Sequence, residues 1–157
     1  GGSKDPTGGA VMIYTALTKK AMKVAYEAHH GQTDRSGTPY IFHPFHVAEQ
    51  MDDELSVCTA LLHDVIEDTE ITFEDLTGEF PEEVEALRCL TRDKNMNYFD
   101  YIRKLRKNPI AKKVKQADLL HNSDVTRLSD CENISAEQIS RLHGRYKRAL
   151  EILHDAR

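Results

Sequence analysis

The sequence of 157 residues is long enough for one domain with a sizeable core, and 30% of its residues are charged while 39% are hydrophobic. Its formal net charge of -5 argues against broad nucleic-acid binding, and no apolar run approaches the roughly 20 residues that a membrane helix needs. Neither a nucleic acid nor a membrane is therefore expected as a partner.

The chain start and the cysteines also carry information. The first ten residues, which are rich in glycine, are expected to be the remnant of a tag or a disordered leader, and residues 11–157 are expected to form a single domain. The cysteines, at positions 58, 89 and 131, fit no C-x-x-C spacing. They predict free thiols in a reducing, cytoplasmic compartment.

The spacing of apolar residues is helical along almost the whole chain, and no run alternates convincingly as a strand. Thr15 is expected to cap the first helix and Gly31 to end it, and a loop rich in turn formers follows over residues 31–40. Helices are expected at residues 16–30, 44–51, about 55–67, from 72, from 81, at about 98–107, at 109–129 and from 136 to about 155. The sequence therefore predicts an all-α bundle of about seven or eight helices.

The third of these helices carries an unusual polar stripe. Residues four apart lie on one face of a helix, so His63 is expected above Glu67 and Asp64 above Asp68. Leucine, valine and isoleucine border the stripe on both sides. Unpaired carboxylates in an apolar setting are costly, and a divalent cation is the simplest compensation for such a group.

Four motifs together are more specific than the stripe alone. They are His43 before Pro44, the pair His63-Asp64, the pair Glu67-Asp68, and Asp118 with Asn122 one helical turn later. This combination resembles the HD superfamily of metal-dependent phosphohydrolases, which is named after the adjacent His-Asp pair. It is most similar to the alarmone (ppGpp) hydrolase domain of RelA/SpoT proteins and to small SpoT-like hydrolases of the Mesh type. The resemblance covers about residues 21–122 and implies the HD-domain helical bundle.

The resemblance also implies a metal site. Carried over position by position, it makes His43, His63, Asp64 and Asp118 the ligands of one divalent cation, most often Mn²⁺ in the family. An imidazole and carboxylate set also accepts Fe²⁺ or Zn²⁺. Four protein ligands leave coordination positions open for a water and a phosphate oxygen.

The same resemblance implies catalytic and substrate-binding residues. Glu67 and Asp68 match the pair that holds and deprotonates the attacking water in the family. Arg35, Ser36 and Asn122 match positions that contact the substrate. The implied activity is that of a guanosine-3′,5′-bis(diphosphate) 3′-pyrophosphohydrolase, which acts on a small nucleotide and releases GDP or GTP and pyrophosphate. The synthetase domain of long family members is not expected, because it would need a comparable further length after Arg157.

One position departs from the family pattern. The family loop commonly reads Arg-Lys-Ser-Gly-x-Pro-Tyr with its basic residues against guanine, whereas this chain has Asp34 followed by Arg35. A carboxylate repels a polyphosphate and does not stack on a purine, so arginine at position 34 is expected to improve ppGpp binding. Two alternatives stay open: an HD phosphohydrolase acting on a nucleoside monophosphate or another nucleotide, and a non-catalytic nucleotide sensor. The sequence does not indicate the oligomeric state.

Overall fold

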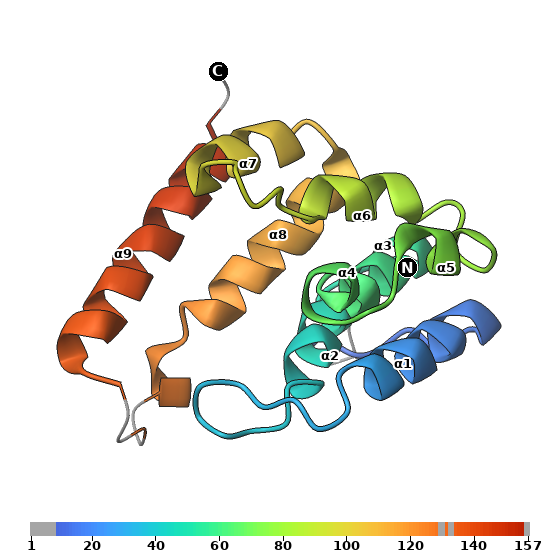
Figure 1. The fold of residues 1–157 in the computed structure, drawn as a ribbon, viewed down its shortest axis with the longest axis horizontal. Helices are drawn as coiled ribbons and strands as arrows, with labels where there is room; N and C mark the ends of the chain where they lie inside the picture. Colours follow the sequence, from blue (N-terminus) through green and yellow to red (C-terminus); the bar gives the residue numbers. More distant parts are fainter. Residues whose placement is uncertain (1–8, 129–130, 132–133, 156–157) are drawn as a thin grey trace.

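A computed structural model describes residues 9–128, 131 and 134–155, and every regular element within them is helical (Figure 1). The predicted all-α class is therefore confirmed. The elements are α1 (Ala16–Ala28), α2 (Phe42–Glu49), α3 (Glu54–Leu62), α4 (Val65–Asp68), α5 (Phe73–Thr77), α6 (Val84–Leu90), α7 (Tyr98–Leu105), α8 (Pro109–Asn122), the 3₁₀ helix η1 (Val125–Leu128) and α9 (Ala136–Leu153). Most of the expected leader, and Ser129 at the expected end of the seventh helix, lie outside the described residues.

The helix starts follow from local capping chemistry. Thr15, Thr72 and Ser135 each accept a hydrogen bond from the backbone N–H three residues later, and the side chain at that later position bonds back to the cap. Pro109 stands in the first turn of α8, where its missing N–H leaves no helical bond unmade. The cap predicted at Thr15 is confirmed, and the helices expected from residues 72, 109 and 136 begin within one residue of these positions.

Helices α3 and α8 organise the bundle. In α3 every residue from Ser56 to Leu62 is buried, and the helix contacts α1, α2, α6 and α8. Helix α8 crosses the middle of the molecule, with α9 along one side and the α1–α3 group on the other (Figure 1). In the described residues, no helix combines the length and apolar character needed to cross a membrane.

The predicted helix over residues 55–67 is wrong at its centre, because the structure divides it into α3 and α4. The imidazole Nδ1 of His63 lies 2.5 Å from the carbonyl oxygen of Ala60, and the backbone N–H of His63 approaches the same oxygen at 3.4 Å. That oxygen is the one to which Asp64 would donate in a continuous helix. A side chain thus replaces a backbone donor at the break.

Two other helix bounds differ from the prediction by three residues or more, and the remaining differences are smaller. Helix α8 ends at Asn122, with Ser123 as its C-terminal cap, and the chain continues into η1. The Ser123 hydroxyl bonds to the carbonyl oxygen of Leu119, one of the last orphan acceptors of the helix. The helix that was expected from Pro81 is α6, which begins at Val84 after a turn.

Candidate metal centre and active site

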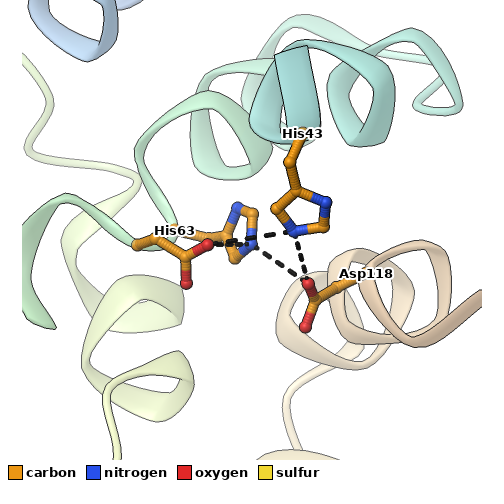
Figure 2. A group of neighbouring side chains, drawn as sticks. His43, His63 and Asp118 are labelled. Atoms are coloured by element: carbon orange, nitrogen blue, oxygen red, sulfur yellow. Dashed lines mark hydrogen bonds and ion pairs between the residues drawn. The ribbon is translucent and has the colours of Figure 1, made fainter. Parts of the chain in front are cut away.

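Four side chains from three parts of the bundle converge at one point (Figure 2). His43 is the second residue of α2, His63 and Asp64 form the junction between α3 and α4, and Asp118 lies on α8. One possible ligand atom from each residue lies within 4.8 Å of all the others. The structure therefore brings together all four residues predicted as metal ligands.

The shortest approaches all involve imidazole Nε2 atoms. Nε2 of His43 lies 2.8 Å from Oδ1 of Asp118, and Nε2 of His63 lies 3.0 Å from Oδ2 of Asp64 and 3.5 Å from Oδ1 of Asp118. In a continuous helix neighbouring side chains point about 100° apart. His63 and Asp64, adjacent at the junction of α3 and α4, nevertheless approach each other through Nε2 and Oδ2.

The histidine nitrogens fit a cation. His63 is 3% exposed, and in the described part of the chain its Nε2 has no hydrogen bond of acceptable geometry despite the nearby carboxylates. Its Nδ1 bonds to the carbonyl of Ala60 and so carries a proton, which leaves Nε2 as the nitrogen that faces the carboxylates. Metal-binding histidines usually hold their second nitrogen in this way. Although burial opposes it, the two carboxylates raise the pKa of this ring, and a cation would take the place of the proton on Nε2. This orphaned buried nitrogen between two carboxylates suits a divalent metal ion.

A second histidine supports His43. Nδ1 of His43 lies 2.7 Å from Nδ1 of His121, and the two rings are stacked with centroids 5.0 Å apart. Burial, with a further contribution from Arg127, lowers the pKa of His121 to about 3, so its ring is neutral and its unprotonated nitrogen can accept a hydrogen bond. When His43 presents the Nε2 lone pair to a metal, its Nδ1–H donates to His121.

Asp118 is held at both carboxylate oxygens. Oδ2 lies 2.8 Å from the ammonium nitrogen of Lys115, and Oδ1 accepts a hydrogen bond of 3.1 Å from the Asn122 amide. Burial alone would raise the pKa of Asp118, but Lys115 and the histidines hold it well below its ordinary value. The pKa of Asp64 is likewise lowered, because His63 outweighs the opposing effect of burial. Both carboxylates are therefore ionised and available to a cation.

Glu67 and Asp68 lie on α4, one turn beyond this cluster, and both are exposed. Partial burial and the charge of Asp64 raise the pKa of each. One oxygen of Glu67 accepts a hydrogen bond from the backbone N–H of Arg92. The two carboxylates line a cavity of about 530 Å³, together with Arg92, Lys94 and two uncharged residues.

A second cavity, of about 260 Å³, opens next to His43. Its lining includes Arg35 and Asn122, two of the three residues predicted to bind substrate. The third, Ser36, is absent from this lining, and its hydroxyl bonds to Asp34 at 2.6 Å within the loop. The structure therefore places Arg35 and Asn122 beside the cluster and gives Ser36 a contact inside the loop.

Asp34 itself has a local structural role. One of its oxygens accepts hydrogen bonds from the backbone N–H groups of Ser36 and Thr38, and the other lies 3.3 Å from the Arg127 guanidinium. Although burial opposes it, these contacts lower the pKa of Asp34. The ionised carboxylate is thus bound by the loop backbone and paired with Arg127, which a comparison with the family loop did not predict, although Asp34 also lines the cavity that contains Arg35 and Asn122.

Three residues that contact the cluster were not predicted to be part of the site: Tyr40, Lys115 and His121. Of these, His121 was expected to be structural. The hydroxyl of Tyr40 donates to Oδ2 of Asp64. Tyr40 lies in the loop motif just before His43, and Lys115 precedes Asp118 by one turn, so their spacing was a usable signal. His121 falls one residue away from the face of α8 that carries Asp118 and Asn122, and only the packing against α2 reveals its partner.

A family model described as "HD domain" matches residues 21–121. This chain belongs to the HD-domain family. The match contains the whole cluster and the Glu67-Asp68 pair.

Three curated relatives show where in the HD-domain family the similarity lies. The bifunctional (p)ppGpp synthase/hydrolase SpoT of Escherichia coli is 47% identical over 73 residues, 44% of this chain and 10% of that protein. A GTP pyrophosphokinase of Myxococcus xanthus is 47% identical over 75 residues, 45% of this chain and 10% of that protein. A putative chloroplastic GTP diphosphokinase, RSH1 of Arabidopsis thaliana, is 50% identical over 70 residues, 41% of this chain and 8% of that protein. Each match thus spans a tenth or less of the relative.

A solved structure is similar over nearly the whole chain. Its TM-score is 0.77 at 25% sequence identity, and the match covers 92% of this chain and 89% of the other. That protein is described as a metazoan ortholog of SpoT that hydrolyses ppGpp and plays a role in starvation responses. The helical bundle described above is therefore that of a SpoT-like HD domain.

Proposed function

We propose that this HD domain removes the 3′-pyrophosphate of (p)ppGpp, giving GDP or GTP and pyrophosphate. The observation that carries the proposal is the four-residue cluster of buried histidines and carboxylates, with a pair of carboxylates one turn away. The similarity to a SpoT ortholog that hydrolyses ppGpp supports the choice of substrate. The predicted cytoplasmic location belongs to the same proposal, and the free state of all three cysteines agrees with a reducing compartment.

His43, His63, Asp64 and Asp118 would hold the cation, which we propose to be Mn²⁺ from the donor set and the family resemblance. A divalent cation in such a site supplies a Lewis acid for a phosphate oxygen and lowers the pKa of a bound water. Tyr40 donates to Asp64 and His121 accepts from His43, so both ligands keep their orientation when substrate enters.

The remaining groups divide between the two cavities. Glu67 and Asp68 orient the attacking water and take its proton, for which a pKa above that of an ordinary carboxylic acid is suited. Arg92 and Lys94 line the same cavity and supply positive charge for the leaving pyrophosphate. The nucleoside end occupies the cavity lined by Arg35 and Asn122.

A second candidate is hydrolysis of another nucleotide, such as a nucleoside monophosphate. It is favoured by Asp34, because the loop then offers Arg35 as its only basic residue toward the base. In the family a basic side chain at position 34 lies against guanine, so its replacement by Asp34 would allow a different base to bind. The metal cluster and the Glu67-Asp68 pair would serve both substrates.

Product analysis separates these candidates. The purified protein is incubated with Mn²⁺ and either ppGpp or a panel of nucleoside monophosphates, and the products are separated by ion-exchange chromatography. GDP and pyrophosphate from ppGpp, with the monophosphates untouched, would support alarmone hydrolysis. Phosphate released from the monophosphates instead would replace the substrate and keep the site.

The division of roles within the site can be tested by two substitutions. Asp64→Ala should abolish both Mn²⁺ binding and turnover, because Asp64 is a proposed ligand. Glu67→Ala should keep the metal and lose at least about 10²-fold in kcat, because it is proposed to handle the water. Calorimetric Mn²⁺ titration and initial rates measure the two effects. Equal loss of metal in both variants would contradict the assignment.

A further inference from the structure

Lys115 is a buried cation beside the proposed metal site. Only 12% of its side chain is exposed, and its ammonium nitrogen lies 2.8 Å from Oδ2 of Asp118, one turn later on α8. The same ammonium lies 5.3 Å from the ring centre of Tyr101 and 5.8 Å from that of Tyr98. Buried lysines are rare unless they are paired, so the contact with Asp118 is what allows this ammonium group to lie at a site with so little exposure.

The groups around Lys115 keep its side chain charged and direct the ammonium group to Asp118. The two aromatic rings on α7 face the ammonium and favour its charged form. Among the residues that the structure describes, Asp118 is the carboxylate that pairs with it by direct contact. Oδ1 of the same carboxylate faces the two imidazole Nε2 atoms, at 2.8 Å and 3.5 Å. Each oxygen of Asp118 therefore has its own set of partners.

We propose that Lys115 is a positioning residue of the metal centre: its ammonium group occupies Oδ2 of Asp118, so that only Oδ1 is presented to the cation. A carboxylate held in this way binds a metal through one oxygen. Without the lysine, Oδ2 loses its partner while Asn122 still holds Oδ1, so the carboxylate is able to bind the cation through both oxygens. The second oxygen would then fill a coordination position that the reaction needs for a water or a phosphate oxygen.

The lysine also reduces the negative charge that a phosphorylated substrate meets. Four carboxylates surround the site: Asp64, Glu67, Asp68 and Asp118. A divalent cation offsets two of their charges and Lys115 a third. Burial raises the pKa of Glu67, whereas the charge of Lys115 acts in the opposite sense and favours the ionised form of this carboxylate. Removal of Lys115 should therefore strengthen the attraction for the metal but weaken that for a polyanion.

The test is Lys115→Met, which keeps the side-chain length and removes the ammonium group. Mn²⁺ affinity should stay within about threefold of the wild type or increase. The number of exchangeable waters on bound Mn²⁺, measured by water proton relaxation enhancement, should fall, and kcat should drop at least about 10-fold. The kcat part rests on the proposed function, whereas the relaxation part needs no substrate and tests the inference even if that function is wrong.

Lys113→Met is the matched control, because Lys113 lies on the same helix and pairs with Asp52 at the surface, away from the cluster. It should leave relaxation enhancement and kcat unchanged. Lys115→Arg keeps a charged donor for Oδ2 and should retain the wild-type relaxation enhancement. If Lys115→Met does not fold, Lys115→Gln takes its place with the same criteria. A folded variant with wild-type relaxation and kcat, or one that loses Mn²⁺ altogether, would overturn the proposal.

Discussion

A single carboxylate, that of Asp34, organises the loop between α1 and α2. It accepts hydrogen bonds from two backbone N–H groups of the loop and pairs with Arg127 of η1 at 3.3 Å. Replacing it with arginine would remove these bonds and place two guanidinium groups together. Asp34→Arg should therefore lower the unfolding free energy by about 1–3 kcal/mol and raise the KM for ppGpp. Thermal denaturation and initial-rate kinetics measure both.

The rise in KM expected here is opposite to the improved ppGpp binding that the sequence alone predicts for Asp34→Arg, because the sequence interpretation treated position 34 as a direct substrate contact. Asp34→Asn serves as the control, since an amide oxygen still accepts from Ser36 and Thr38 and only the charge toward Arg127 is lost. It should be milder than Asp34→Arg in both assays. A lower KM for ppGpp in Asp34→Arg would restore the interpretation that a basic residue is missing from the base pocket.

At the scale of an element, α8 presents groups to the metal centre from two adjacent faces. Lys115, Asp118 and Asn122 follow one face, and His121 reaches Nδ1 of His43 from the next. His121→Leu removes the acceptor for the His43 proton. We expect Mn²⁺ affinity to fall about 10-fold or more, because groups that orient a metal-binding histidine typically contribute that much.

The exposed residue His143 on α9 provides a matched substitution, His143→Leu, which should leave Mn²⁺ affinity unchanged. Isothermal titration with Mn²⁺ measures both variants, and circular dichroism checks that they are folded. Unchanged affinity in folded His121→Leu would mean that packing alone orients His43, with no contribution from the hydrogen bond.

The elements also show what the sequence can and cannot reveal. Capping residues such as Thr72 and Pro109 act over three or four positions, so the helix starts were predictable. The break between α3 and α4 depends on one side chain, His63, bonding back to Ala60, and the apolar period runs through it unchanged. The contact of Tyr40 with Asp64 joins residues 24 positions apart and depends on how α2 and α3 pack. Motifs therefore identified four side chains that the fold brings together, whereas the contacts that support these side chains needed the fold.

At the scale of the whole molecule, the metal centre connects segments that are distant in sequence. His43 and Asp118 are 75 residues apart, and the other two proposed ligands, His63 and Asp64, come from the α3–α4 junction. The unfolded chain does not keep these groups together, so a bound cation should stabilise the fold. At 100 times its Kd, Mn²⁺ should add about 2.7 kcal/mol and raise the Tm by roughly 5–10 °C, and EDTA should reverse this.

Two variants show whether this stabilisation comes from the proposed site. Asp64→Asn removes a charged ligand of the cluster and should abolish the Mn²⁺-dependent rise in Tm. Asp100→Asn removes an equal charge from an exposed ion pair with Arg103 on α7 and should keep the rise. Differential scanning calorimetry with and without Mn²⁺ measures all three proteins. The same rise in Asp64→Asn as in the wild type would place the stabilising cation elsewhere, because the cluster cannot lose a carboxylate ligand without weakening its hold on a divalent ion.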